Sequence, residues 1–277
     1  MSISDRIGAA PAVKPGATAT PPLPDGAAPA AGYALRFDHV TKTFTHHTGQ
    51  LLLRDRLWRM LRPSQRGRRL VALNDISFEL GHGDSLALIG HNGAGKSTCL
   101  SLATGLSLPD SGRIEVRGRV AAILELGGGF HHDLTGAENL RINAALMGLT
   151  RRQTAERYET IIDFSGIRES IDDPLRTYSA GMIMRLAFSV AVHTDPDILL
   201  LDEVIGLGYQ YFFERCLEKI RDFQRQGKTI VLASHSLELL QMFCQRAMWL
   251  DHGHVMMHGP AAEVVEAYRA RPAPAAR

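Results

Sequence analysis

Strongly apolar runs of strand length alternate along the chain with longer segments whose apolar residues recur at helical spacing. Three runs carry almost no polar residue, as buried parallel strands do: 85–89, 197–201 and 229–233. Helical spacing predicts helices over 137–147, 153–164, 180–192, 211–225 and 237–244, with another helix starting near 98. Strands alternating with helices indicate an α/β fold with a mainly parallel core sheet.

Weaker patterns fill the rest of the ordered region. Apolar and polar residues alternate in four places that we interpret as strands or a hairpin: 33–37, 112–116, 120–126 and 248–257. These add an antiparallel β portion to the parallel core. The helix-rich stretch over about 130–185 predicts an inserted helical subdomain. We expect one ordered domain over 33–268.

Three segments have a different composition. Residues 1–32 scatter six prolines among alanines and glycines, so we expect a disordered tail, and 269–277 form a short Ala/Pro/Arg tail. Residues 46–70 form an insertion with seven arginines and apolar residues at helical spacing. This insertion is either a solvated basic helix over the sheet edge or a contact for a membrane partner or anionic headgroups.

Composition limits the function classes. The 277 residues are 45% hydrophobic, enough for a full core, and the net charge of +2 is too small to indicate a nucleic-acid partner. Three distant cysteines lack metal-ligand spacing and suit a reducing compartment. No apolar run reaches the roughly 18 residues of a membrane span, and a signal peptide's apolar core is missing. We expect a cytoplasmic protein, soluble or peripheral.

The segment after the 85–89 run matches the phosphate-loop pattern G-x-x-x-x-G-K-[ST]. Its glycines let backbone amides converge on phosphate oxygens at the start of a helix. The lysine can reach the β- and γ-phosphates, and the serine hydroxyl can ligate Mg²⁺. The pattern predicts ATP and Mg²⁺ as cofactors. The nucleotide-binding residues are Gly90, His91, Asn92, Gly93, Ala94, Gly95, Lys96, Ser97 and Thr98.

Three further motifs carry polar chemistry. Asp202 and Glu203 end an apolar strand, where Asp202 can hold Mg²⁺ and Glu203 can orient or deprotonate the attacking water. Ser179, Gly181 and Met182 lie where a helix begins, a second arrangement suited to phosphate. His235 follows the 229–233 strand and is interpreted as a sensor of the γ-phosphate.

In this order the motifs resemble those of the ATPase subunits of ATP-binding cassette (ABC) transporters, over about 34–268. Residues 90–98 resemble the family's Walker A motif, and Asp202 with Glu203 its Walker B motif and catalytic carboxylate. Residues 179–182 resemble the signature loop, His235 the switch histidine, and Phe44 the aromatic residue that stacks on adenine. The resemblance implies catalytic roles for Glu203, His235 and Lys96, and Mg²⁺ ligation by Ser97 and Asp202.

Variant motifs resemble a narrower group, the ATPases of bacterial exporters of O-antigen, capsule or teichoic acid. They are the signature YSAGM at 178–182, LELGGGFH at 124–131, LTGAEN at 134–139 and VIGLG at 204–208. The resemblance implies a head-to-tail dimer with two shared ATP sites, a separate membrane-spanning permease, and a place on the cytoplasmic face of the inner membrane. The alternatives are another ABC transporter, for lipid, drug or import, or a soluble ABC ATPase without transport.

The chain departs from its family at two places. Glu125 or Leu126 stands where most transporter ATPases have a glutamine, and Tyr209 stands where the exporter group has an aspartate. A phenol cannot supply the carboxylate that links the two ATP sites, so we expect ATP binding to persist and coupling between sites to weaken. The alternative is that Tyr209 packs at the dimer interface of a working variant.

Two remaining expectations concern cargo and metal. The domain ends near Tyr268, so we expect no C-terminal glycan-reading β-sandwich, and cargo selection by the permease or the lipid-linked end of the glycan. Histidines at 252 and 254 flank a glycine in an expected hairpin turn. We interpret them as solvated turn residues that diverge across the sheet, rather than as a metal site.

Overall fold

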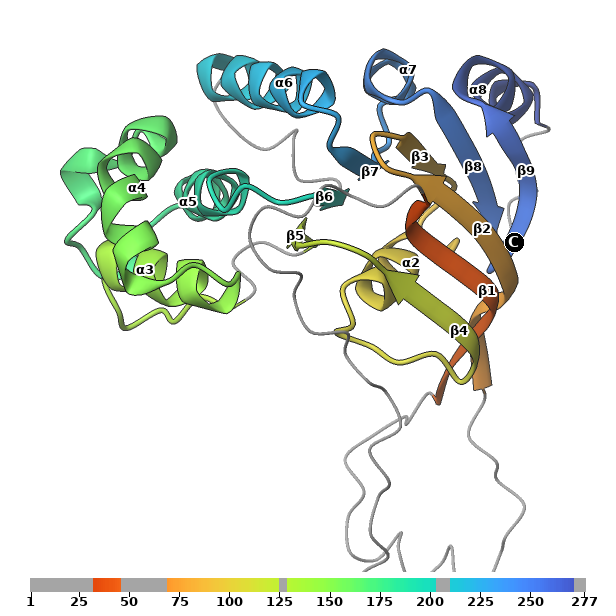
Figure 1. Ribbon diagram of the computed structural model, residues 1–277, viewed down its shortest axis with the longest axis horizontal. Coiled ribbons are helices and arrows are strands. Elements are labelled where there is room, and N and C mark those ends of the chain that lie inside the picture. Colours follow the sequence, from red (N-terminus) through yellow and green to blue (C-terminus); the bar gives the residue numbers. More distant parts are fainter. Residues whose placement is uncertain (1–31, 46–68, 125–128, 203–209, 272–277) are drawn as a thin grey trace, which may run out of the picture.

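The structure is a computed structural model, and it describes residues 32–45, 69–124, 129–202 and 210–271. Figure 1 shows a layered α/β body with a group of helices, α3, α4 and α5, at one end. The fold class expected from the sequence is confirmed: a mainly parallel core sheet, an antiparallel β portion and a group of helices.

The larger sheet has six strands in the order β5-β6-β7-β3-β8-β9. All neighbouring pairs are parallel except β8 and β9, which form an antiparallel hairpin at one edge. In sheet order the strands are Val120–Ile123, Ile198–Asp202, Thr229–Ala233, Ser85–Ile89, Arg246–Asp251 and His254–Pro260. Every residue of β3, β6 and β7 is buried, which fits their uninterrupted apolar sequences.

The smaller sheet is antiparallel, in the order β2-β1-β4. Its strands are Arg69–Gly81, Tyr33–Thr45 and Ser111–Val116. The first expected strand, 33–37, is thus the beginning of a 13-residue strand, and β2 was not predicted. Between the two sheets lies α2, Lys96–Ala103, in a core that also includes Leu86, Leu88 and Leu100.

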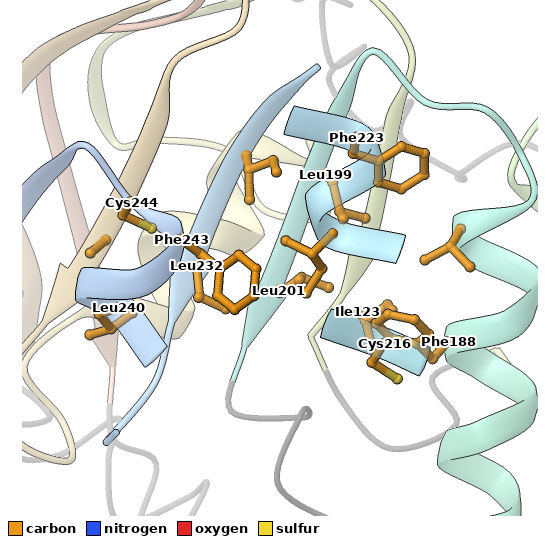
Figure 2. Packing of buried hydrophobic residues seen from close by; sticks show 14 of the residues in the cluster. Ile123, Phe188, Leu199, Leu201, Cys216, Phe223, Leu232, Leu240, Phe243 and Cys244 are labelled. Atoms are coloured by element: carbon orange, nitrogen blue, oxygen red, sulfur yellow. The ribbon is translucent and has the colours of Figure 1, made fainter. Parts of the chain in front are cut away.

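The opposite face of the larger sheet is covered by helices. Alternate residues of one strand reach opposite faces, so Ala87 and Ile89 join this core while Leu86 and Leu88 join the other. Figure 2 shows Leu199, Leu201 and Leu232 of the sheet beside Phe188, Phe223 and Phe243 of the helices. The helices are α5 (Ala180–Val192), α6 (Gln210–Arg225), α7 (Leu237–Phe243) and α8 (Ala261–Ala270).

The helix group forms a third core. Helices α3 (Gly136–Leu146) and α4 (Arg151–Ser165) pack with α5 around Leu140, Ile161 and Leu186. Each of α3 and α4 begins at a capping box, in which a threonine and the residue three positions later satisfy each other's backbone amides. Within the described residues, none of the helices combines the length and apolarity needed to cross a bilayer.

Candidate nucleotide-binding site

The phosphate loop joins β3 to α2. Helix α2 begins at Lys96, two residues before the expected start near 98, so Lys96 and Ser97 lie in its first turn. Its N-cap residue, Gly95, has a left-handed φ of 114° and provides no side-chain cap for the first-turn amides. The first-turn amides and the positive end of the helix dipole together make the start of α2 suitable for binding an anion.

Two backbone segments enclose the loop from behind. A Cβ at Gly90 would overlap the Leu250 carbonyl oxygen and lie 2.8 Å from the Ala94 Cβ. A Cβ at Gly95 would lie 2.7 Å from the Ala72 carbonyl oxygen. Gly90 and Gly95 are therefore required by contacts with β8 and β2, in addition to any approach of phosphate, whereas a Cβ at Gly93 would meet no atom within 4 Å.

Lys96 is held within the loop that precedes it. The residue is 5% exposed, and its Nζ donates hydrogen bonds to the carbonyl oxygens of Gly90 at 2.9 Å and His91 at 3.3 Å. Ser97, the next residue, is exposed. The loop thus presents a fixed ammonium group, an exposed serine and first-turn amides close together in the chain, a set of groups suited to a polyphosphate.

The acidic motif reaches the same edge of the sheet. Asp202 is the last residue of β6 and is 6% exposed. It pairs in register with Ala233 of β7, so Ser234 and His235 follow immediately beside it, and His235 is exposed. Because β7 lies between β6 and β3, Asp202, His235 and the phosphate loop all leave the carboxyl edge of neighbouring strands. A carboxylate and a hydroxyl are ligands that Mg²⁺ accepts.

The signature residues are on the helix group. Ser179 caps α5, accepting a hydrogen bond from the Met182 amide at 3.2 Å, and a Cβ at Gly181 would have the Ser179 Oγ, 3.8 Å away, as its nearest neighbour. Figure 1 shows α5 grouped with α3 and α4, to one side of the strands that deliver the phosphate loop and Asp202. The second helix start that suits an anion is therefore the beginning of α5, whereas the phosphate loop lies at the beginning of α2.

Phe44 is near the end of β1 and is 45% exposed. The Lys42 ammonium lies 5.5 Å from its ring centroid and also donates to the Leu108 carbonyl oxygen at 2.6 Å. Several expected residues lie outside the described ranges: Glu125 and Leu126, and the segment 203–209 with Glu203 and Tyr209. Their roles stay predictions.

The motif at 134–139 contacts the variant signature at 178–182, although the two are distant in sequence. A Cβ at Gly136, in the 134–139 motif, would overlap the hydroxyl of Tyr178, the first residue of the variant signature. Tyr178 donates that hydroxyl to the Ser170 carbonyl oxygen, and burial, with Asp173 second, raises the pKa of its phenol to about 12. Asn139 is fully buried. Its side-chain amide accepts a hydrogen bond from the His131 N–H and donates one to the His131 carbonyl oxygen. These contacts shape the segment that precedes the signature helix.

The contact between Gly136 and Tyr178 gives a prediction for stability. Gly136→Ala is expected to destabilise the protein by about 2 kcal/mol, because the new methyl group overlaps the phenol oxygen. Tyr178→Phe alone should lower stability by about 1 kcal/mol through the lost hydrogen bond. The double variant should be more stable than the sum of the two effects implies, by at least ~0.5 kcal/mol. Urea unfolding of the four proteins measures this coupling.

Gly259→Ala is the matched control, because a Cβ at Gly259 meets no atom within 4 Å. Its midpoint should equal that of the parent. Strict additivity of Gly136→Ala and Tyr178→Phe would show that the two residues do not interact.

The fold and the arrangement of polar groups at its sheet edge define a P-loop ATPase domain of the ABC type. The ABC transporter family model matches residues 73–206. The O-antigen export system ATP-binding protein RfbB of Klebsiella pneumoniae is 43% identical over 239 residues, covering 85% of this chain and 97% of that protein. The teichoic acids export ATP-binding protein TagH of Bacillus anthracis is 39% identical over 236 residues, covering 85% of this chain and 42% of TagH.

Solved structures show the same fold. A dimeric ATP-binding cassette bound to ADP and Pi gives a TM-score of 0.67 at 17% identity and covers 82% of this chain and 98% of that one. An ATP-binding subunit of an ABC transporter gives 0.68 at 23% identity and covers 87% and 95%. The chain belongs to the ABC transporter family and is an ATPase of that family.

Proposed function

We propose that this ATPase powers a bacterial exporter that moves a polysaccharide or lipid-linked glycan across the inner membrane through a separate permease. The observation that carries the proposal is the 43% identity to the O-antigen export protein, over 97% of that protein's length. The identity to a teichoic acid export protein supports the same cargo class. The subunit would act at the cytoplasmic face of the membrane, as a peripheral partner of the permease.

The site residues would divide the chemistry of hydrolysis among them. Lys96 and the loop amides would bind the β- and γ-phosphates, with Phe44 stacking on adenine. Ser97 and Asp202 would hold Mg²⁺, which supplies charge neutralisation at the transferred phosphoryl group. Glu203 would place the attacking water, and the exposed His235, beside Asp202 at the sheet edge, would sense the γ-phosphate.

A second copy of the chain would complete each ATP site. The phosphate loop and the Ser179 helix start both suit anions, yet the former joins β3 to α2 and the latter begins α5, which is grouped with α3 and α4. A head-to-tail dimer would place the Ser179–Met182 segment of one copy over the loop of the other. The dimeric cassette among the solved relatives supports this arrangement.

Deleting the gene in its own bacterium tests the function. We expect surface polysaccharide to disappear and the lipid-linked glycan to accumulate inside the cell. The gene for the parent protein should restore export, and the gene for Lys96→Met should not. Surface glycan that stays normal, together with accumulation of a lipid or loss of import, would instead favour another ABC transporter. Normal glycan together with a ribosomal or repair defect would favour a soluble ABC ATPase.

Tyr209→Asp tests the coupling between the two ATP sites. If a phenol at 209 weakens communication across the dimer, the aspartate variant should turn ATP over faster and with a steeper Hill slope than the parent. ATP affinity should stay the same, because the phosphate-binding groups lie elsewhere. Equal rates and slopes would favour the alternative, in which Tyr209 packs in a working interface.

A further inference from the structure

Two histidines and an aspartate join the phosphate loop to the β8–β9 turn. His91 is the second residue of the loop, Asp251 ends β8, and His252 is the first turn residue. The Asp251 Oδ1 lies 2.8 Å from the His91 Nε2 and 3.9 Å from the His252 Nε2. One potential ligand atom from each of the three residues lies within 4.8 Å of the others. The sequence pattern indicates solvated turn residues at His252 and His254 rather than a metal site, and it does not connect either of them with His91, which the structure groups with His252.

The hydrogen bonding of His91 is the main argument that the group binds a cation. Its Nδ1 lies 2.6 Å from the Asn92 carbonyl oxygen, which can only accept, so Nδ1 carries the proton. A neutral imidazole then directs its Nε2 lone pair at the Asp251 carboxylate, which also only accepts. A metal ion between Nε2 and the carboxylate would satisfy both. A ring N–H donated to a backbone carbonyl is the usual support of a metal-binding histidine.

His252 supplies a third potential ligand beside His91 and Asp251. A second proton on His91 would join only His91 to Asp251, whereas a metal ion could also bind His252, whose ring centroid lies 4.7 Å from that of His91. Tetrahedral Zn²⁺ with bonds of about 2.0–2.1 Å separates its ligand atoms by about 3.3 Å. The separations of 2.8 Å and 3.9 Å lie on either side of that value.

The backbone holds the two elements together independently of any ion. The Gly253 amide donates to the Ala94 carbonyl oxygen at 3.0 Å, which docks the turn on the phosphate loop. His252 and Gly253 have φ of 45° and 79°, as in a type I′ hairpin turn. The ligands therefore come from two fixed segments. His91 and Asp251 are half-buried and His252 is exposed, which leaves room for water as a fourth ligand.

We propose that His91, Asp251 and His252 bind a divalent transition-metal ion, best matched by Zn²⁺. Two imidazoles and one carboxylate, with an open fourth position, are ligands of zinc, whereas Mg²⁺ prefers oxygen ligands only. The site is distinct from the proposed Mg²⁺ ligands Ser97 and Asp202. A bound ion would tie the phosphate loop to the β8–β9 turn.

The test is Zn²⁺ titration of the chelator-washed, untagged full chain, with ZnCl₂ as the probe. We expect one saturable site per chain. His252→Ala should weaken the affinity for Zn²⁺ at least about tenfold, because loss of even an outer-shell partner of a metal ligand costs about that much. His254→Ala is the matched control, because His254 is two residues away on the same hairpin but its Nε2 lies 3.5 Å from the Asn74 side-chain nitrogen. Its affinity for Zn²⁺ should equal that of the parent.

Three additional measurements keep the result interpretable. Melting temperatures without metal must match among the three proteins, and Asp251→Asn, which keeps the side-chain shape, should also lose the site. Co²⁺ bound to the parent should show the visible absorption of a tetrahedral complex, and His252→Ala should lose it. Absence of a saturable site, or equal binding by His252→Ala and the parent, overturns the proposal. Loss of binding in His254→Ala as well would also overturn it, because the ion would then be bound elsewhere.

Discussion

Glu203→Gln is expected to lower the ATP turnover number by about 10²–10⁴, while ATP affinity remains close to that of the parent. Glu203 directly follows Asp202, which the buried strand β6 delivers to the sheet edge beside His235. The amide cannot accept a proton from water, but it retains the size and polarity of the carboxylate. Steady-state ATPase rates and equilibrium binding of a fluorescent ATP analogue measure the two effects separately.

The same variant should accumulate an ATP-bound dimer, because closure no longer ends in hydrolysis. Light scattering with and without ATP reports that state. Glu218→Gln, on the exposed side of α6, is the control and should behave as the parent does. Unchanged turnover in Glu203→Gln would remove Glu203 from the proposed mechanism.

Lys96→Met is expected to weaken ATP binding by about 10–100-fold and to reduce hydrolysis to background. The ammonium group would form charge-assisted hydrogen bonds with phosphate, each worth about 1.5–3 kcal/mol. Methionine keeps most of the side-chain volume, so the 5% exposed site stays filled. Isothermal titration with ATP and Mg²⁺ gives the affinity of each protein.

Because Lys96 also bonds the Gly90 and His91 carbonyl oxygens, the loop itself could loosen in this variant. Thermal unfolding without nucleotide measures that effect separately from binding. Lys219→Met, on α6, controls for the loss of one positive charge elsewhere. Full ATP affinity in Lys96→Met would show that the loop amides alone bind the phosphates.

The sequence predicted the parallel strands best, because they are buried on both faces and their apolar residues are contiguous. The runs 85–89 and 229–233 coincide with β3 and β7, and the helix predicted over 180–192 coincides with α5. Ser179 gave a clear start for that helix through its capping side chain. In these elements the sequence pattern and the observed burial indicate the same structure.

Strand β2 was missed for a physical reason. Residues 76–80 of this strand alternate between buried and exposed, but 69–75 do not, because the register with β1 shifts within that part and Asp75 has a left-handed φ of 54°. Helix α8 was missed as well, since its ten residues follow a strand without a side-chain cap. A strand whose alternation is interrupted halfway, and a short helix without a capping side chain, both give weak signals in the sequence.

Local motifs identified the polar groups of the candidate site, but contacts between motifs depend on strand pairing. The phosphate loop could be predicted from the sequence because its residues are contiguous. His91 and Asp251 meet across 160 residues, because β3 and β8 are paired in parallel. The contact of Gly136 with Tyr178 likewise depends on how α3 packs against α5. No spacing in the sequence indicates either contact.

The support behind the phosphate loop also has a consequence for the order of biosynthesis. The loop at 90–97 is translated early, but Gly253, which bonds both the Ala94 carbonyl oxygen and the Asn74 amide, leaves the ribosome much later. At about 5–20 residues per second, the delay is on the order of 10 to 30 s. During that time a nascent chain carries the nucleotide motif without the hairpin that shapes it. Competence to bind ATP should therefore arise late in synthesis, once the last strands have joined the sheet.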